Sequence, residues 1–312
     1  MTTLLLTHSV CLKHDTGDYH PECAERLSAI LHILEHEDFF YLARDEAPKA
    51  TRQQLLRAHS PEHVEHVFES PPDGDEVIEF APDTMMSRHS VEAALRSAGA
   101  GCAAVDEVVT KRSTNVFCAV RPPGHHAEAN EAMGFCLFAN AAIAALHARD
   151  VHGLKRVAVV DFDVHHGNGT QKILWDEPGM FYASTHQLDA FPYTGVVEET
   201  GGEGGAVVVN VPLRQGSGGT EFRAAFTDII LPKLRDFAPE LVIISAGFDA
   251  HAADPMAHLR LQVSDFDWVT RQLLQVARDF SDRKLVSILE GGYDPRALAT
   301  CVAAHVRALM DA

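Results

Sequence analysis

The hydrophobic residues of this chain form short continuous runs, which are separated by longer stretches with helical spacing. Two runs, Val157–Val160 and Leu241–Ile244, are apolar at every position, which is typical of strands buried on both faces of a parallel sheet. The full set of runs predicts strands over Thr3–His8, Asn115–Val120, Arg156–Phe162, Met180–Thr185, Ala206–Val211, Leu241–Ser245 and Lys284–Glu290. The helical spacing predicts helices over Pro21–His36, Ser87–Thr110, Phe138–Val151, Gly219–Asp236, Ser264–Ser281 and Pro295–Ala312.

Strands that alternate with helices predict an α/β fold, with a central, mostly parallel, multi-stranded sheet and helices on both faces. No internal repeat and no Pro/Ser-rich linker divides the sequence, so we expect a single domain over residues 1–312. Two stretches, 70–85 and 186–205, show neither pattern. We expect both to be surface loops of the kind that border binding sites.

Composition narrows the classes of function. The chain has 26 Lys and Arg against 44 Asp and Glu, a formal net charge of −18, which argues against general binding to nucleic acid or anionic membranes. No apolar run approaches the length of a membrane span, and residues 1–10 lack the basic start of a secretory signal. The six cysteines include no Cys-x-x-Cys pair, so we expect reduced thiols in a cytoplasmic protein.

Polar side chains follow five of the predicted strands at the points where these strands end. In open α/β sheets, ligands bind beyond the carboxyl ends of the strands, so these side chains are expected to gather at one site. In chain order the polar segments are Arg121–His126, Asp161–Asn168, Ser184–His186, Asp249–His251 and Glu290–Tyr293.

Asp163 and His165 lie two residues apart on an extended segment, so their side chains point to the same side and can bind one cation. Asp249, which ends another strand, is the best candidate for a third ligand. Three protein ligands with open positions are the catalytic form of a zinc site. A structural Asp–His ion pair is the alternative for the Asp-x-His motif alone, but Asp249 and the nearby histidine pair favour the metal.

The adjacent His125 and His126 follow a Pro-Pro-Gly turn, and such a pair can act as general base and electrostatic partner near neutral pH. Asp161 and Asn168 are available to orient the two rings. Tyr293 follows two glycines, and its hydroxyl can stabilise an oxyanion on a metal-bound carbonyl. Taken singly, a histidine pair is more often a surface feature and a tyrosine a packing residue.

Together these segments form a set of motifs that resembles the zinc-dependent histone deacetylases, especially their class II branch and the bacterial histone deacetylase-like amidohydrolases. The matching segments keep the family order from residue 20 to residue 293: His20–Glu22 with Arg26, Arg121–Glu128, Gly134–Cys136, Asp161–Gln171, Ser245–Ala250, Asp254–Pro255 and Glu290–Tyr293. Because they span nearly the whole chain, they are highly specific in combination.

The resemblance implies an arginase-like α/β fold with one zinc ion per chain. By the family pattern, Asp163, His165 and Asp249 are the zinc ligands. The family also binds potassium, through main-chain oxygens of the segment Asp161–His165 and through the residue that matches Ser184. Zinc and potassium are therefore the cofactors that the resemblance predicts.

The same resemblance assigns roles in catalysis. It implies that His126 is the general base and then the general acid, while His125, paired with Asp161, is its electrostatic partner. Tyr293 is expected to polarise the amide carbonyl. Residue 168 is Asn, as in class II, where other branches carry Asp, so His126 is expected to have a neutral partner.

The resemblance further implies residues that contact the substrate. Those that match the acyl-lysine channel, its gate or the acetate exit are Gly134, Phe135, Phe191, Met256 and Arg26. Asp83, on the predicted loop before the helix at Ser87, is a further candidate for binding the substrate main chain at the rim. Polyamine-preferring relatives carry an acid at the position of Met256, so methionine favours acyl-lysine or a neutral amide.

The expected function is therefore hydrolysis of acyl-lysine, or of a small acylated amine, by metal-activated water. An acetylpolyamine amidohydrolase with the same chemistry is the alternative, and a metal-dependent acyl-binding module without turnover is a third reading. A two-metal ureohydrolase of the arginase type is disfavoured, because Gly167 stands where a third acid would be needed. The sequence leaves open the physiological substrate, the acyl length and the oligomeric state, including a homo-oligomer.

Overall fold

The computed structural model describes residues 2–312, so the first residue of the expected 1–312 domain lies outside the described residues. Its central sheet has eight strands in the order β2-β1-β5-β10-β9-β6-β7-β8, and all neighbouring strands are parallel. The strands are β1 (Thr3–Thr7), β2 (Ala43–Glu46), β5 (Asn115–Cys118), β6 (Val157–Asp161), β7 (Met180–Gln187), β8 (Val207–Leu213), β9 (Leu241–Ala246) and β10 (Leu285–Leu289). All seven expected strands and their parallel arrangement are confirmed.

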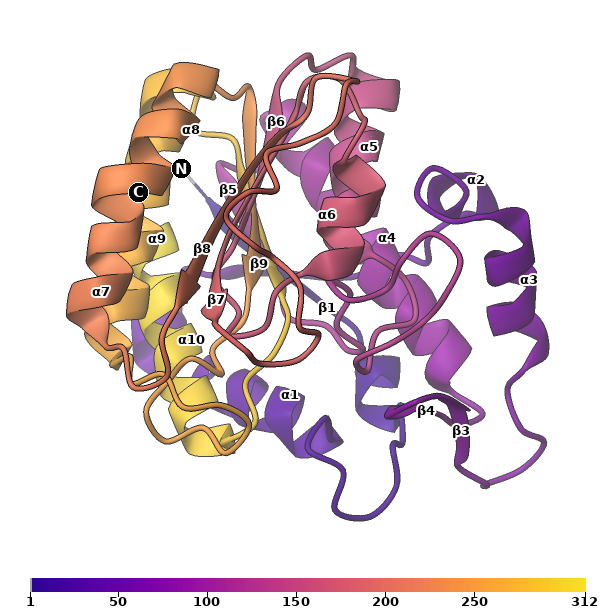
Figure 1. Cartoon of the computed structure of the whole chain (residues 1–312). Helices are drawn as coiled ribbons and strands as arrows, with labels where there is room; N and C mark the ends of the chain where they lie inside the picture. Colours follow the sequence, from indigo (N-terminus) through magenta and orange to yellow (C-terminus); the bar gives the residue numbers. More distant parts are fainter. Residues whose placement is uncertain (1) are drawn as a thin grey trace.

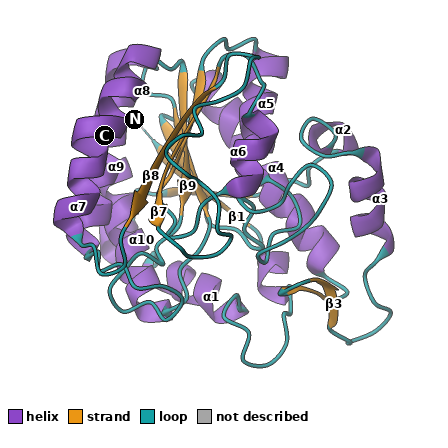
Figure 2. Cartoon of the chain, viewed as in Figure 1, coloured by secondary structure: helices purple, strands orange, loops and turns teal. Residues whose placement is uncertain are grey.

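Helices lie on both sides of this sheet (Figure 1). The described α-helices are α1 (Ala24–Ile33), α2 (Arg52–Leu55), α3 (Pro61–Glu69), α4 (Ser90–Val109), α5 (Asn140–His152), α6 (Asn168–Leu174), α7 (Gly219–Ala224), α8 (Leu231–Phe237), α9 (Val263–Phe280) and α10 (Pro295–Met310), with short 3₁₀ turns at Ser9–Lys13 and Glu37–Phe39. Seen along the sheet, α4, α5 and α6 cover one face, and α8, α9 and α10 cover the other (Figure 2). The expected α/β class, with helices on both faces, is confirmed.

Two strand predictions were incomplete. β2 was not predicted, because an edge strand pairs on one side only and its sequence Ala-Arg-Asp-Glu is largely exposed. The stretch 70–85 was expected to be a loop, but it contains most of an antiparallel hairpin made of β3 (Ile78–Ala81) and β4 (Thr84–Met86). The two strands of this hairpin have four and three residues, too few to show an alternating pattern of apolar and polar positions. The other expected loop is confirmed from residue 188 onward, since β7 extends to Gln187.

The predicted helix over Gly219–Asp236 is divided into three parts. α7 leads into a π-helical segment, Ala225–Ile230, and α8 follows directly. Pro232 lies in the first turn of α8 and has no backbone N–H, so one α-helical hydrogen bond is missing where the two segments meet. The short helices α2, α3 and α6 were not predicted, since four to nine residues give too few turns for a periodic signal.

The four central strands, β5, β10, β9 and β6, are buried at every residue. Burial on both faces explains why their sequences are apolar without alternation. Because all eight strands are parallel, their carboxyl ends lie at one edge of the sheet, where the polar segments follow them. No helix within residues 2–312 is both long enough and apolar enough to cross a bilayer.

Candidate metal-dependent active site

Three potential metal ligands meet beyond the ends of two neighbouring strands. Asp163 and His165 follow β6, and Asp249 follows β9, which pairs directly with β6. Their ligand atoms all lie within 4.8 Å of one another, and all three side chains are buried. Nδ1 of His165 is 3.1 Å from Oδ1 of Asp163 and 3.2 Å from Oδ2 of Asp249. The structure thus brings together the three residues that the sequence pattern selected.

Main-chain donors orient these carboxylates. The N–H of Val164 donates to Oδ1 of Asp249 over 2.8 Å, and the N–H of Gly291 donates to Oδ2 of Asp163 over 2.8 Å. Oδ2 of Asp249 is buried, and its polar contact is with Nδ1 of His165, another candidate ligand. Since a buried carboxylate oxygen needs a compensating positive charge, this oxygen is suited to a cation. Two carboxylates and one imidazole form a donor set that fits zinc.

The close packing of these groups raises the pKa of both Asp249 and His165. Burial, followed by the charge of Asp163, raises the pKa of Asp249 above its usual range. Burial alone would lower the pKa of His165, but hydrogen bonds and charge from the two carboxylates outweigh it and raise this pKa to about 10. The cluster therefore takes up a positive charge readily.

Two histidines beside the cluster differ in their partners. Nδ1 of His125 lies 3.0 Å from Oδ2 of Asp161, whereas Nδ1 of His126 lies 2.8 Å from Oδ1 of Asn168. Burial would lower the pKa of His125, but the carboxylates of Asp163 and Asp161 outweigh it and raise this pKa to about 10. Burial, with the neighbouring charges of His125 and then His165, moves the pKa of His126 well below its usual value. The carboxylate partners thus favour the charged form of His125, whereas the surroundings of His126 favour its neutral form.

Glu290 holds the histidine turn in place, a role that the sequence reasoning did not assign. Its Oε2 accepts hydrogen bonds from the N–H groups of Gly124 and His125, over 2.7 and 3.1 Å, and Ser245 donates to Oε1 over 2.9 Å. Burial raises the pKa of Glu290 to about 7. The signals in the sequence were an acid directly after the buried strand β10 and its place in a segment that matches the family motifs.

Five of the six predicted substrate contacts, all except Arg26, surround one small cavity. It has a volume of about 160 Å³ and is lined by Asp83, His126, Gly134, Phe135, His165, Phe191, Met256 and Tyr293. A Cβ atom at Gly134 would lie 2.5 Å from the ring of His126, and the backbone there has a φ of +54°, so glycine is required at this wall. Phe191 and Met256 are more than a third exposed and stand at the opening. All of the channel and rim residues selected from the sequence are therefore brought together.

Arg26 lies behind this cavity rather than in its lining. Its guanidinium carbon is 4.8 Å from the ring centre of Tyr293, and it donates to the main-chain oxygens of Gly292 and Glu290 over 2.5 Å each. The N–H of Tyr293 is held by Oδ2 of Asp254 over 2.6 Å. Burial raises the pKa of Tyr293 well above 10, although the charge of Arg26 opposes this shift. The phenol therefore stays protonated and can donate.

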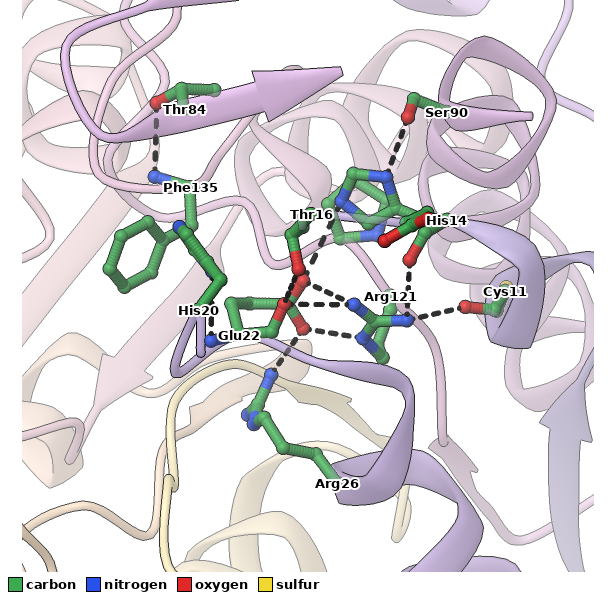
Figure 3. Close-up of polar contacts among 12 residues, drawn as sticks. Cys11, His14, Thr16, His20, Glu22, Arg26, Thr84, Ser90, Arg121 and Phe135 are labelled. Atoms are coloured by element: carbon green, nitrogen blue, oxygen red, sulfur yellow. Dashed lines mark hydrogen bonds and ion pairs between the residues drawn. The ribbon is translucent and has the colours of Figure 1, made fainter. Parts of the chain in front are cut away.

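Glu22 joins two buried arginines, Arg26 and Arg121 (Figure 3). It accepts a bidentate pair of hydrogen bonds from Arg121, over 2.6 and 2.7 Å, and one from Arg26 over 2.7 Å. All three side chains are fully buried. Burial acts to raise the pKa of Glu22, but the charges of Arg121 and then Arg26 outweigh it and lower this pKa to about 2. The sequence reasoning quoted these residues as motif positions and gave Glu22 and Arg121 no role.

We expect Glu22→Gln to lower the free energy of unfolding by on the order of 3 kcal/mol at neutral pH, because both arginines keep buried charges without an anion. The folded-state pKa of Glu22, about 2, lies below its ordinary value of 4.5, so its stabilisation is complete above 4.5 and is lost as the pH falls toward 2. Denaturant unfolding should therefore show a difference that shrinks below about pH 4.5. Glu25→Gln, at an exposed position three residues later in α1, is the matched control. A difference that is constant from pH 7 to the acid limit would contradict this account.

Ser184 lies beside Asp161 across the β6–β7 pair. Its hydroxyl is 2.9 Å from Nδ1 of His186, and both side chains are buried. The candidate potassium residues are thus neighbours at the end of the sheet.

The comparisons with known proteins agree with this geometry. The family model for the histone deacetylase domain matches residues 20–309. A histone deacetylase-like amidohydrolase of Pseudomonas aeruginosa is 37% identical over 93% of this chain and 76% of its own length. Histone deacetylase 14 of Arabidopsis thaliana, a chloroplastic protein, is 36% identical over 98% of this chain and 76% of its own.

Two further relatives extend this comparison. The human polyamine deacetylase HDAC10 is 37% identical over 93% of this chain and 45% of its own length. The crystal structure of the HDA15 HD domain superposes with a TM-score of 0.92 at 35% identity, covering 99% of this chain and 88% of that one. With the family model matched over almost the whole chain and relatives of this identity, this chain belongs to the histone deacetylase family and is an amide-hydrolysing enzyme of the deacetylase type.

Proposed function

We propose that this enzyme is a zinc-dependent amidohydrolase that removes acetyl or other short acyl groups from acyl-lysine or a similar amide. One observation carries the proposal: the neutral His126, the protonated Tyr293 and the ligand candidate His165 line the same cavity of about 160 Å³. A proton acceptor, an oxyanion donor and a metal ligand are the three groups that hydrolysis of an unactivated amide requires.

Asp163, His165 and Asp249 would hold the zinc ion. When bound there, zinc lowers the pKa of water and polarises a carbonyl oxygen. Oδ1 of Asn168 accepts from Nδ1 of His126, which leaves Nε2 free to take a proton from the attacking water.

The same His126 then returns that proton to the departing amine, so that a carboxylate and a free amine are released. The cationic His125, held by Asp161, stabilises negative charge that develops next to it. The phenol of Tyr293 donates a hydrogen bond to the carbonyl oxygen as charge accumulates on it.

A second catalytic metal of the arginase type does not fit this site. An acid at position 167 would be needed to bridge two ions, but residue 167 is Gly. A Cβ atom at Gly167 would lie 2.4 Å from Oδ2 of Asp161 and 2.7 Å from the hydroxyl of Tyr182. Because there is no room for a side chain there, we propose a single zinc ion at this site. We also propose that potassium binds near Asp161 and Ser184.

The opening of the cavity favours acyl-lysine over acetylpolyamine. Phe135 and Phe191 offer apolar walls to a methylene chain, and the only acid in the lining is Asp83. Met256, about 38% exposed, offers no charge to a second ammonium group of a polyamine. Acetylpolyamine hydrolysis remains the second candidate, because one relative is named as a polyamine deacetylase.

The deciding experiment is a kinetic comparison of zinc-loaded enzyme on an acetyl-lysine peptide, acetylspermidine and small acyl amides. We expect amide hydrolysis that a chelator abolishes and zinc restores, with the peptide preferred. Absence of hydrolysis on every acyl substrate would favour a binding module instead. A preference for acetylspermidine would instead identify the enzyme as an acetylpolyamine amidohydrolase.

We expect Met256→Glu to shift the preference toward acetylspermidine by roughly fivefold in kcat/KM. At a partly exposed position, a carboxylate near an ammonium group is worth about 1 kcal/mol, close to that factor. Met256→Gln is the matched control, since it has similar size without charge. The ratio of kcat/KM for the two substrates is the measurement, and equal ratios for the two variants would remove Met256 from the specificity determinants.

We also propose a cytoplasmic location. Each of the six cysteines is free, and five of them are buried, which suits a reducing compartment.

A further inference from the structure

We propose that Asp106, His147 and His152 form a second metal site, which binds a transition-metal ion such as zinc outside the active site. Asp106 belongs to α4, and both histidines belong to α5. Oδ1 of Asp106 lies 2.8 Å from Nε2 of His147 and 2.6 Å from Nε2 of His152. All three ligand atoms lie within 4.8 Å of one another, so two adjacent helices aim three donors at one point.

This cluster is separate from the catalytic residues. His152 is the last residue of α5, and β6 begins at Val157 shortly after it. The candidate zinc ligands follow the opposite end of β6, beyond Asp161. The two clusters therefore lie toward opposite ends of β6, the strand that separates them in the chain (Figure 1).

The donor set determines the class of metal. Two imidazole nitrogens and one carboxylate oxygen are ligands typical of zinc and of other borderline divalent ions. Calcium and magnesium prefer oxygen ligands, so they are disfavoured here. Water can complete the coordination, because the Asp106 side chain is 39% exposed and that of His152 is 17% exposed.

The hydrogen bonds within this cluster are compatible with metal binding by the same atoms. Both Nε2 atoms contact the same carboxylate oxygen, Oδ1 of Asp106, so all three candidate donor atoms already converge on one point. His147 is nearly fully buried, and its Nδ1 has no hydrogen-bond partner. When Nε2 binds a metal, the ring proton must move to Nδ1, and this move breaks no hydrogen bond there. A bound ion would replace both shared N–H bonds and cross-link α4 to the end of α5.

Zinc content at micromolar free zinc tests the proposal. We would dialyse the wild-type protein, Asp249→Ala, His152→Ala and the double variant, and measure zinc per chain by mass spectrometry. The expected result is close to two ions in wild type, one in each single variant and none in the double variant. His32→Ala, which removes an exposed histidine, is the matched control and should keep both ions.

The same set of variants separates this proposal from the assignment of the active site. Loss of one ion in His152→Ala with unchanged amidase activity supports the second site, whatever Asp249→Ala shows. Cobalt added to Asp249→Ala should give the visible absorption of a tetrahedral ion, and His152→Ala should remove that signal. Equal zinc content in wild type and His152→Ala at every zinc concentration would overturn the proposal. The cluster would then only hold α4 and α5 together by hydrogen bonds.

A structural measurement covers the case in which His152→Ala fails to fold. Crystals of wild-type protein soaked in zinc should show an anomalous peak between Nε2 of His147 and Nε2 of His152. Asp106→Asn, which keeps the size of the side chain, should weaken that peak. No peak between the two rings in zinc-soaked wild-type crystals would overturn the proposal without any variant.

Discussion

Asp249→Ala is expected to lose tight zinc binding at the active site and amidase activity together. Its carboxylate is one of the three candidate ligands, and its buried Oδ2 lies 3.2 Å from Nδ1 of His165, another candidate ligand. Loss of outer-shell partners alone typically lowers metal affinity by about 10–100-fold, so loss of a direct ligand should exceed about 100-fold. The measurements are zinc competition with a chelator of known affinity and turnover of an acetyl-lysine peptide.

The control for this variant removes a carboxylate without touching the site. Asp279→Ala changes an exposed acid on α9 and should keep both zinc affinity and activity. Because the second cluster keeps its own ligands, the zinc affinity must be assigned to a site by repeating the competition in His152→Ala. Unchanged zinc affinity of Asp249→Ala in that background would remove Asp249 from the ligand set.

Tyr293→Phe is expected to keep zinc and to lower kcat by roughly 10²–10³, the usual cost of one oxyanion donor. The phenol is protonated, lies in the cavity lining and is supported by Arg26 and Asp254. Since phenylalanine keeps the ring, the packing against Phe135 is preserved. The measurement is kcat on an acetyl-lysine peptide, with zinc content recorded for the same sample.

A matched variant isolates the effect of the hydroxyl at the site. Tyr193→Phe removes the hydroxyl of an exposed tyrosine outside the cavity lining and should leave kcat unchanged. If Tyr293→Phe turns over substrate at near wild-type rate while it retains zinc, another donor must stabilise the oxyanion. If it loses zinc, the tyrosine contributes to the metal site rather than to the transition state.

Much of the candidate site could be located from the sequence because its residues follow strands with strong patterns. Val157–Asp161 and Leu241–Ala246 are buried throughout, so their sequences are continuously apolar and their ends are easily located. The two-residue spacing of Asp163 and His165 on an extended segment then fixes their common direction. Asp249 was selected as the third ligand because it too follows a strand, and the structure adds that this strand, β9, lies directly beside β6.

Other features carry almost no local signal. The edge strand β2 and the β3–β4 hairpin are short and partly exposed, so burial imposes no clear periodicity on them. The π-helical segment within the predicted helix over Gly219–Asp236 retains helical spacing on both sides, which hides the change of hydrogen bonding. In each case the structure depends on contacts that the local sequence does not encode.

The sequence by itself determined the α/β class, the parallel strands and the identity of the residues that gather at their ends, because burial and spacing act locally. Only the tertiary structure decided that Glu22 joins Arg121, which is 99 positions away, and that Asp106 meets two histidines on another helix. These contacts depend on how helices and loops pack in space. Packing brings together positions that are far apart in the chain, so no pattern of neighbouring residues reveals them.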